Sequence, residues 1–348
     1  MQWFSAAYPP DKKDLDSLLA SPLRADLNQL NDLPKTHVIT DEADVLRDVG
    51  EAFAAKLCAA CNDVTAVRCE GILHGFAMLN AVSRTNAARA AVDQSGRFLH
   101  DERMRESSLP GGFVNAVVRV GDTVRRPASA RTKFVGDLLR LLEASGWRGA
   151  PRYLGMDDEG REVLGYLDGH VAWESRQPAS VSSDESLVTV ARLVRGFHDL
   201  TAGTPLAGDQ EVVCHNDLSP KNTVYQLSSG GLRPAAFIDW DLAAPGARIH
   251  DIAHVCWQYL DLGPSVTDID NAARRMRLIV DSYELSDRQR LVSTILWWQD
   301  RCWRGIEAQA DAGDVAMARL RDAGAVRQVQ TACQWVTDHR AALERAVR

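Results

Sequence analysis

The chain has 348 residues, of which 45% are hydrophobic and 25% are charged, a composition typical of a globular protein. This length is too great for one ordinary core and predicts two or three domain-sized units. A formal net charge of −7 and the lack of any Lys/Arg-rich run argue against a nucleic-acid-binding protein.

The sequence shows none of the usual signs of a membrane or secreted protein. No apolar stretch approaches the length of about 18 residues that a membrane-spanning helix needs. The first residues, MQWFSAAYPPDKKDLD, do not combine a basic region with an apolar run as a signal peptide does. Seven cysteines, a modest and odd number, fit free thiols in a reducing compartment, so we expect a cytoplasmic protein.

Residues 1–105 are predicted to form a helical N-terminal extension whose role the sequence does not indicate. The segments LDSLLASPLRADLNQL and DEADVLRDVGEAFAAKLCAAC carry apolar residues at helical spacing, and Asp41 is placed to cap the second helix. Cys58, Cys61, Cys69 and His74 are candidate zinc ligands. Because this region is Ala-rich and helical in pattern, buried thiols are the preferred interpretation.

Residues 106–168 are predicted to form a small antiparallel sheet with one helix. Residues 117–124 predict a hairpin around a Gly-Asp turn, and KFVGDLLRLLEASGW predicts an amphipathic helix. PRYLGMDDEGREVLGYLDG predicts two further strands. Residues 169–348 are mostly helical by pattern, which places a domain boundary near Asp168-Gly169.

The stretch VVCHNDLSPKNTV places Asn222 five residues after Asp217. This is the layout of a kinase catalytic loop, in which the Asp accepts a proton from the attacking hydroxyl and the Asn helps to hold Mg²⁺. The strand-like run AAFIDWD then delivers Asp239, where kinases carry a further Mg²⁺ ligand. A capped turn and a strand-end carboxylate are the alternative interpretations.

In these motifs the chain resembles the aminoglycoside phosphotransferase family, kinase-like enzymes that phosphorylate small molecules. His215-Asn216-Asp217 through Asn222 match the family's H-G-D-x-x-x-x-N pattern. Ile238-Asp239-Trp240 and Asp251-Ile252-Ala253 match its later I-D-[WF]-x…D-x-A pattern. The resemblance covers roughly residues 109–345 and does not reach the first hundred residues. It implies an α+β, protein-kinase-like fold with a small antiparallel sheet lobe and a large helical lobe.

The resemblance implies that Asp217 is the catalytic base and that Asn222 and Asp239 are the Mg²⁺ ligands. Asp251 is expected either to bond the backbone of the catalytic loop or to cap a helix. His215 is expected to pack and hydrogen-bond within the loop.

The chain departs from the family and kinase patterns at two positions. Asn216 stands where the family has Gly, and Asn tolerates an unusual backbone conformation better than most residues. Asp241 stands where protein kinases have the Gly of D-F-G, and it is expected to be solvated rather than to serve the metal. Lys221 is likewise expected to be solvated, although it is placed to reach a phosphate.

The nucleotide side is implied by the same resemblance. Gly112 and Asn115, in GGFVN, stand where a glycine loop covers the phosphates. The strand that should carry a phosphate-binding Lys offers Arg125 and Arg126, of which we favour Arg126.

Two further expectations concern the partner of that Arg and the nucleotide base. Asp137 or Glu143 on the following helix is expected to pair with the Arg. The backbone of the hinge segment that includes Leu164 and Tyr166 is expected to bond the base of ATP or GTP.

The expected acceptor is the hydroxyl of a small molecule, such as an aminoglycoside or another amino or sugar alcohol. Trp297, Asp300 and Glu307 can fall near one helix face, which would suit a cationic amine, but an amphipathic helix with Trp in the core is the preferred interpretation. The alternative function is a non-catalytic, kinase-like nucleotide-binding scaffold, which the Arg in place of Lys favours. A protein kinase is disfavoured because no A-P-E segment follows Asp239.

Overall fold

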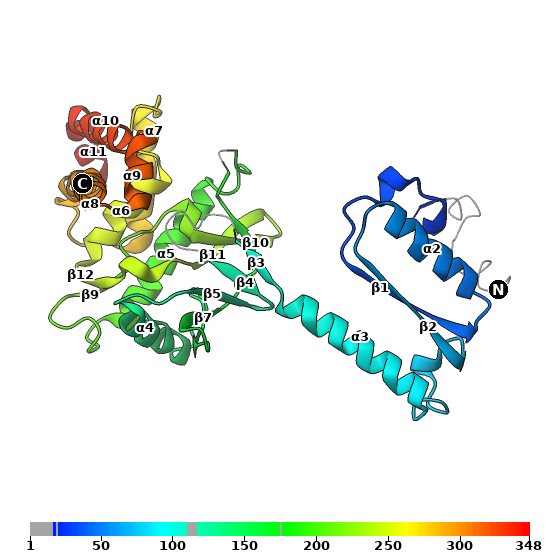
Figure 1. The fold of residues 1–348 in the computed structure, drawn as a ribbon. Helices are drawn as coiled ribbons and strands as arrows, with labels where there is room; N and C mark the ends of the chain where they lie inside the picture. The colour runs from blue at the N-terminus through cyan, green and yellow to red at the C-terminus, as the bar shows by residue number, and fades with distance from the viewer. Residues whose placement is uncertain (1–16, 19, 110–116, 175) are drawn as a thin grey trace. The chain divides into compact units, whose positions relative to one another are not determined.

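The computed structural model describes residues 17–18, 20–109, 117–174 and 176–348, and the chain divides into two compact units, Met1–Arg105 and Glu106–Arg348 (Figure 1).

The first unit is built around two parallel strands. β1 (Thr36–Ala43) pairs with β2 (Val64–Leu73), α2 (Arg47–Ala59) connects them, and α3 (Asn86–Met104) follows β2. The prediction of a wholly helical extension is therefore wrong for these two strands, whereas the helix predicted over DEADVLRDVGEAFAAKLCAAC is present as α2. The β-branched residues of THVITDEA and VTAVRCEGIL favour strands, but the helical spacing of the Ala-rich segments around them outweighed this signal in the prediction.

Two small apolar clusters hold the helices of this unit against the strands. Leu57 of α2 packs in a cluster with Leu30, whereas Ala88 of α3 packs in a second cluster with Ile72 and Phe76. Both helices contact both strands. The parallel pair is thus covered by α2 and α3, as parallel strands generally are.

Asp41 and the cysteines do not occupy their predicted places. Asp41 lies within β1, and Leu46 precedes the first residue of α2. Cys58 and Cys61 are exposed and Cys69 lies on β2, so the prediction of buried helical thiols is wrong. Within the part of the chain that the structure describes, none of the three cysteines joins a cluster of candidate metal ligands.

The second unit begins with an antiparallel sheet of order β3-β4-β5-β7-β6. Its strands are β3 (Glu106–Ser108), β4 (Val118–Val120), β5 (Thr123–Pro127), β6 (Tyr153–Met156) and β7 (Arg161–Gly165). The predicted hairpin and the two later strands are confirmed, and β3 was not predicted. α4 (Thr132–Ala144) lies between β5 and β6 in the chain, as predicted, and it buries Leu138, Leu139 and Leu142 on one face.

The rest of the second unit is mainly helical, with two small sheets. The helices are α5 (Asp184–Thr201), α6 (Arg248–Tyr259), α7 (Ile269–Tyr283), α8 (Leu291–Asp311), α9 (Val315–Asp322), α10 (Ala325–Asp338) and α11 (Arg340–Val347). The sheets pair β8 (His170–Val171) and β11 (Gly231–Phe237) with β10 (Thr223–Ser228), and β9 (Val212–Cys214) with β12 (Ala244–Gly246).

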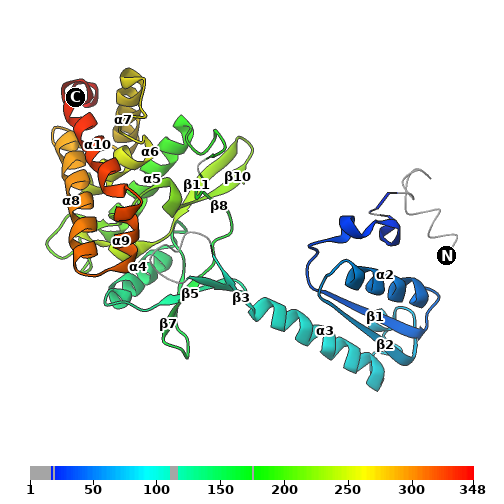
Figure 2. The same cartoon turned by 45° about the horizontal axis from the view of Figure 1, so that its top comes forward.

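Within the second unit, the helices α7 to α11 gather at one end and the five-stranded sheet with α4 lies at the other (Figures 1 and 2). One continuous core joins the two ends, and it includes Leu139 of α4, Phe197 of α5, Trp240 and Ile252 of α6. The predicted α+β fold with a small sheet lobe and a large helical lobe is confirmed. Among the described residues, no helix has the length and apolar character needed to cross a membrane.

Candidate active site

The predicted catalytic loop follows β9 directly, and a buried carboxylate fixes its backbone. Asp251, in the first turn of α6, accepts hydrogen bonds from the backbone N–H groups of His215 (2.7 Å) and Asn216 (2.8 Å). The predicted backbone-bonding role of Asp251 is therefore confirmed, while the residue that precedes α6 is Ala247.

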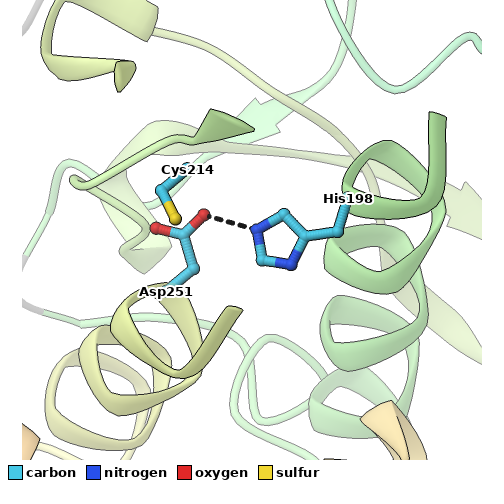
Figure 3. A group of neighbouring side chains, drawn as sticks. All are labelled: His198, Cys214 and Asp251. Atoms are coloured by element: carbon cyan, nitrogen blue, oxygen red, sulfur yellow. Dashed lines mark hydrogen bonds and ion pairs between the residues drawn. The ribbon is translucent and has the colours of Figure 1, made fainter. Parts of the chain in front are cut away.

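Asp251 is itself held by a buried histidine (Figure 3). His198 Nε2 lies 3.0 Å from Asp251 Oδ2, and His198 Nδ1 lies 2.7 Å from the Tyr283 hydroxyl. Burial alone would raise the pKa of Asp251, but the hydrogen bond with His198 and the backbone donors outweigh it, so its pKa lies below the usual value. Burial also lowers the pKa of His198. A neutral His198 that donates a hydrogen bond to a charged Asp251 agrees with the lowered pKa of each residue.

Figure 3 also shows Cys214 beside this pair, and the three side chains could in principle surround a cation. Their polar atoms already have partners, because Cys214 Sγ donates to the Ala247 carbonyl at 3.3 Å and both nitrogens of His198 are engaged. The group therefore serves to support the loop.

Two residues of the site have a left-handed backbone. Asn216 has φ 65° and Asp239 has φ 63°. Asn216 is the residue that replaces the family's Gly, and its side chain stabilises the conformation by donating to the Leu242 carbonyl at 2.9 Å. This bond ties the catalytic loop to the segment that follows Asp239.

The acid and the amide of the motif are in direct contact. Asn222 Nδ2 donates to Asp217 Oδ2 (2.7 Å) and to the Asp217 carbonyl (2.9 Å). Asn222 is buried, and with both amide donors engaged its Oδ1 is the atom that can act as a ligand. His215 Nδ1 accepts a hydrogen bond from the Asp217 backbone N–H at 3.3 Å, which confirms that His215 bonds within the loop, and its Nε2 lies 3.1 Å from the Ile238 carbonyl.

Asp239 lies in a cluster of carboxylates with one buried Arg. Arg126 Nη1 is 2.7 Å from Asp241 and 3.9 Å from Asp239, and Arg126 Nε is 2.5 Å from Glu162. The prediction that Asp241 is solvated is wrong, because it pairs with Arg126. Of the two predicted arginines, Arg126 is the one that faces the carboxylates, whereas Arg125 lies 3.5 Å from Asp157.

The predicted acidic partner of the Arg is also wrong. Asp137 pairs with Lys133 at 2.7 Å, and Glu143 pairs with Arg152 at 2.5 Å. The actual partner, Glu162, lies directly opposite Arg126 in the β5–β7 ladder. Cross-strand neighbours of opposite charge commonly pair, but the register that brings them together is not visible in the local sequence.

The cluster fits a divalent cation. Although 53% of the Asp239 side chain is exposed, desolvation raises its pKa to about 6, and repulsion from Asp241 and Asp217 adds to this. Arg126 and Lys221 oppose the shift without cancelling it. A bound Mg²⁺ would remove this repulsion, and the oxygens of Asp239 and Asn222 are ligands of the kind it prefers.

The other residues that were predicted to bind the nucleotide are Gly112, Asn115, Leu164 and Tyr166. Gly112 and Asn115 lie outside the described residues. Leu164 is buried in β7 opposite Val124. The backbone N–H of Tyr166 donates to the Asp122 carbonyl at 2.9 Å, so in this conformation it is not directed to a nucleotide base.

The predicted acceptor residues Trp297, Asp300 and Glu307 all lie on α8. The ring of Trp297 is 45% exposed and lies 5.0 Å from His250, so the preferred interpretation of a core Trp is wrong for Trp297. Asp300 pairs with Arg304 at 2.8 Å, and Glu307 is half-buried. Burial raises the pKa of the Cys302 thiol on α8, and the negative charge of Asp217 adds to this shift. Cys302 is thus the residue through which α8 approaches the catalytic loop. The sequence carried no signal for Cys302.

Comparisons with known proteins give different results for the two units. Residues 204–278 match the family described as "Phosphotransferase enzyme family", and residues 1–78 match the alpha/beta hydrolase fold. The trifolitoxin immunity protein of Rhizobium leguminosarum bv. trifolii is 32% identical over 212 residues, which are 53% of this chain and 76% of that protein.

Two solved structures are also similar to parts of this chain. A thermostable esterase from Pseudomonas putida is 48% identical, over 28% of this chain and 30% of the esterase, with a TM-score of 0.27. The GDP complex of aminoglycoside 2'-phosphotransferase-IIIa is 14% identical, over 74% of this chain and 99% of that chain, with a TM-score of 0.47. This chain thus spans less than a third of the length of that esterase.

Proposed function

The chain belongs to the aminoglycoside phosphotransferase family, and we propose that it transfers the γ-phosphate of ATP or GTP to a hydroxyl group of a small molecule. The observation that carries this proposal is the contact between Asp217 and Asn222 in a loop whose backbone is bonded by Asp251, together with Asp239 in the adjoining carboxylate cluster.

Each residue would have a distinct task. Asp217 would accept the hydrogen bond of the attacking hydroxyl and take its proton, and Asn222 would keep the carboxylate oriented through Nδ2. Asn222 Oδ1 and Asp239 would hold Mg²⁺. When bound, Mg²⁺ would neutralise the charge that develops on the β- and γ-phosphates. Arg126, buried and facing Asp239, would direct its guanidinium toward phosphate oxygens in place of the usual Lys.

The acceptor we propose is an amino or sugar alcohol such as an aminoglycoside. Because a relative is named a trifolitoxin immunity protein, trifolitoxin belongs in the same acceptor screen. The cytoplasm, which supplies nucleoside triphosphates, is the proposed site of action. Ester hydrolysis is not proposed: no G-x-S-x-G nucleophile motif occurs in these 348 residues.

Nucleotide binding by the full chain tests the proposal. At about a hundred times its dissociation constant, Mg·ATP should stabilise the native protein by about 2.7 kcal/mol, seen as a rise in Tm. Asp239→Asn should reduce this rise, while Asp137→Asn, whose carboxylate pairs with Lys133 on α4, should keep it. No rise with either ATP or GTP in any variant would overturn the proposal. Binding without transfer to any acceptor would favour the scaffold alternative.

A further inference from the structure

The first unit carries a group of chemically reactive side chains at one edge of its parallel pair. Asp41 lies near the end of β1, Asp44 follows β1 directly, and His74 follows β2 directly. Because the strands are parallel neighbours, their carboxyl ends meet at the same edge, where α/β proteins commonly bind ligands. The ladder also shifts register just after Asp41, an irregularity that is frequent next to functional sites.

The three side chains converge. Asp44 Oδ1 lies 3.0 Å from His74 Nδ1, and one ligand atom from each of Asp41, Asp44 and His74 lies within 4.8 Å of the others. Asp44 has a side chain that is 9% exposed, whereas the His74 side chain is 60% exposed, so the group is open to solvent on the imidazole side.

The hydrogen-bonded pair of Asp44 and His74 does not explain why Asp41 is buried beside it. Asp41 is only 5% exposed, and its Oδ1 finds no hydrogen-bond partner among the residues that the structure describes. A buried carboxylate oxygen without a partner is costly and calls for a compensating cation or ligand. The neighbouring Arg47 does not supply it, because its Nε pairs with Asp48 and its Nη1 donates to the Glu42 carbonyl.

We propose that Asp41, Asp44 and His74 bind one divalent transition-metal ion, with Zn²⁺ as the best match. One imidazole and two carboxylates form a mixed nitrogen and oxygen set that suits Zn²⁺ better than Mg²⁺. Zinc ligands lie about 2.0–2.2 Å from the ion, so two ligands of a tetrahedral site lie about 3.3–3.6 Å apart. The ligand atoms of the group lie within 4.8 Å of one another, so their widest separation has to shorten by about 1.5 Å or less to meet this geometry. Three protein ligands leave a fourth position for water.

A carboxylate that orients an imidazole is also the arrangement of a serine hydrolase, and residues 1–78 match the alpha/beta hydrolase fold. That arrangement uses Asp44 and His74 and requires nothing of Asp41. The metal site requires all three residues, so the Asp41 carboxylate separates the two interpretations.

The proposal is tested by titrating the metal-free full chain with Co²⁺, a spectroscopic substitute for Zn²⁺. Excess Mg²⁺ is present throughout, so that it fills the proposed Mg²⁺ site of the second unit. We expect one saturable Co²⁺ per chain with visible absorption bands. Asp41→Asn and His74→Ala should each weaken binding by at least about tenfold, the lower limit found even for outer-sphere partners of metals.

Two control variants should bind Co²⁺ as the wild type does. Cys69→Ser alters the residue opposite Asp41 in the ladder, and Asp239→Asn alters the second unit. Circular dichroism shows whether each variant is folded, and the exposed His74 makes His74→Ala a safe second probe. Unchanged binding in either Asp41→Asn or His74→Ala, loss of binding in Asp239→Asn, or no saturable binding by the wild type would each overturn the proposal.

Discussion

Replacing Asp251 by Asn should destabilise the second unit strongly, because this carboxylate accepts three hydrogen bonds at a fully buried position. The donors are the N–H groups of His215 (2.7 Å) and Asn216 (2.8 Å) and His198 Nε2 (3.0 Å). Hydrogen bonds to a charged group contribute about 1.5–3 kcal/mol each. Two of the donors bond Oδ2 and one bonds Oδ1, so Asn, which keeps one acceptor oxygen and turns an NH₂ group toward a donor, loses at least one of the three bonds.

We expect a loss of about 2–5 kcal/mol in the free energy of unfolding, the value of one or two hydrogen bonds to a charged group. Asp199→Asn is the matched control, because Asp199 pairs with Arg195 and Arg248 but is 47% exposed, and its loss should be about 1 kcal/mol or less. Urea unfolding followed by Trp fluorescence reports the second unit, since every Trp except Trp3 lies there. Equal losses in the two variants would refute the anchoring role of Asp251.

Three further results are expected. Asn216→Ala should cost about 1–2 kcal/mol in urea unfolding, since Ala strains a φ of 65°, whereas Asn216→Gly should cost less; equal costs would contradict this. The pKa of Asp239 is raised to about 6 from 3.8, so without Mg²⁺ its contribution to stability is fully present below about pH 3.8 and is lost as the pH rises through 6. The free energy of unfolding should therefore change with pH differently in the wild type and in Asp239→Asn across this range. Parallel curves of this free energy against pH would refute the raised pKa. Arg126→Ala leaves Glu162 buried and unpaired, so in urea unfolding it should destabilise more than the double variant with Glu162→Gln, and the reverse order would contradict a buried pair.

Local patterns were sufficient for the parts of the molecule in which neighbours in sequence are neighbours in space. The hairpin of β4 and β5, the helix α4 and the loop that joins Asp217 to Asn222 are all of this kind. Even the replacement of Gly by Asn216 pointed to the left-handed backbone found there.

Pairings between distant segments were not predictable from those patterns. Arg126 meets Glu162 only through the register of β5 and β7, and it meets Asp241 only through the packing of the loop after β11. The parallel strands β1 and β2 were mistaken for helix because the helical pattern of the Ala-rich segments around them was extended over them, although half-buried and exposed residues alternate in β2 from Ala66 to Glu70. The convergence of Asp41, Asp44 and His74 depends on that same pairing.

The most direct test of the central claim is transfer of γ-³²P from ATP or GTP to a panel of small hydroxyl compounds by wild type, Asp217→Asn and the exposed control Asp209→Asn. If Asp217 is the general base, its variant should transfer phosphate about 10²- to 10⁴-fold more slowly while it still binds Mg·nucleotide, and the control should match the wild type. Transfer by Asp217→Asn at the wild-type rate would contradict the account.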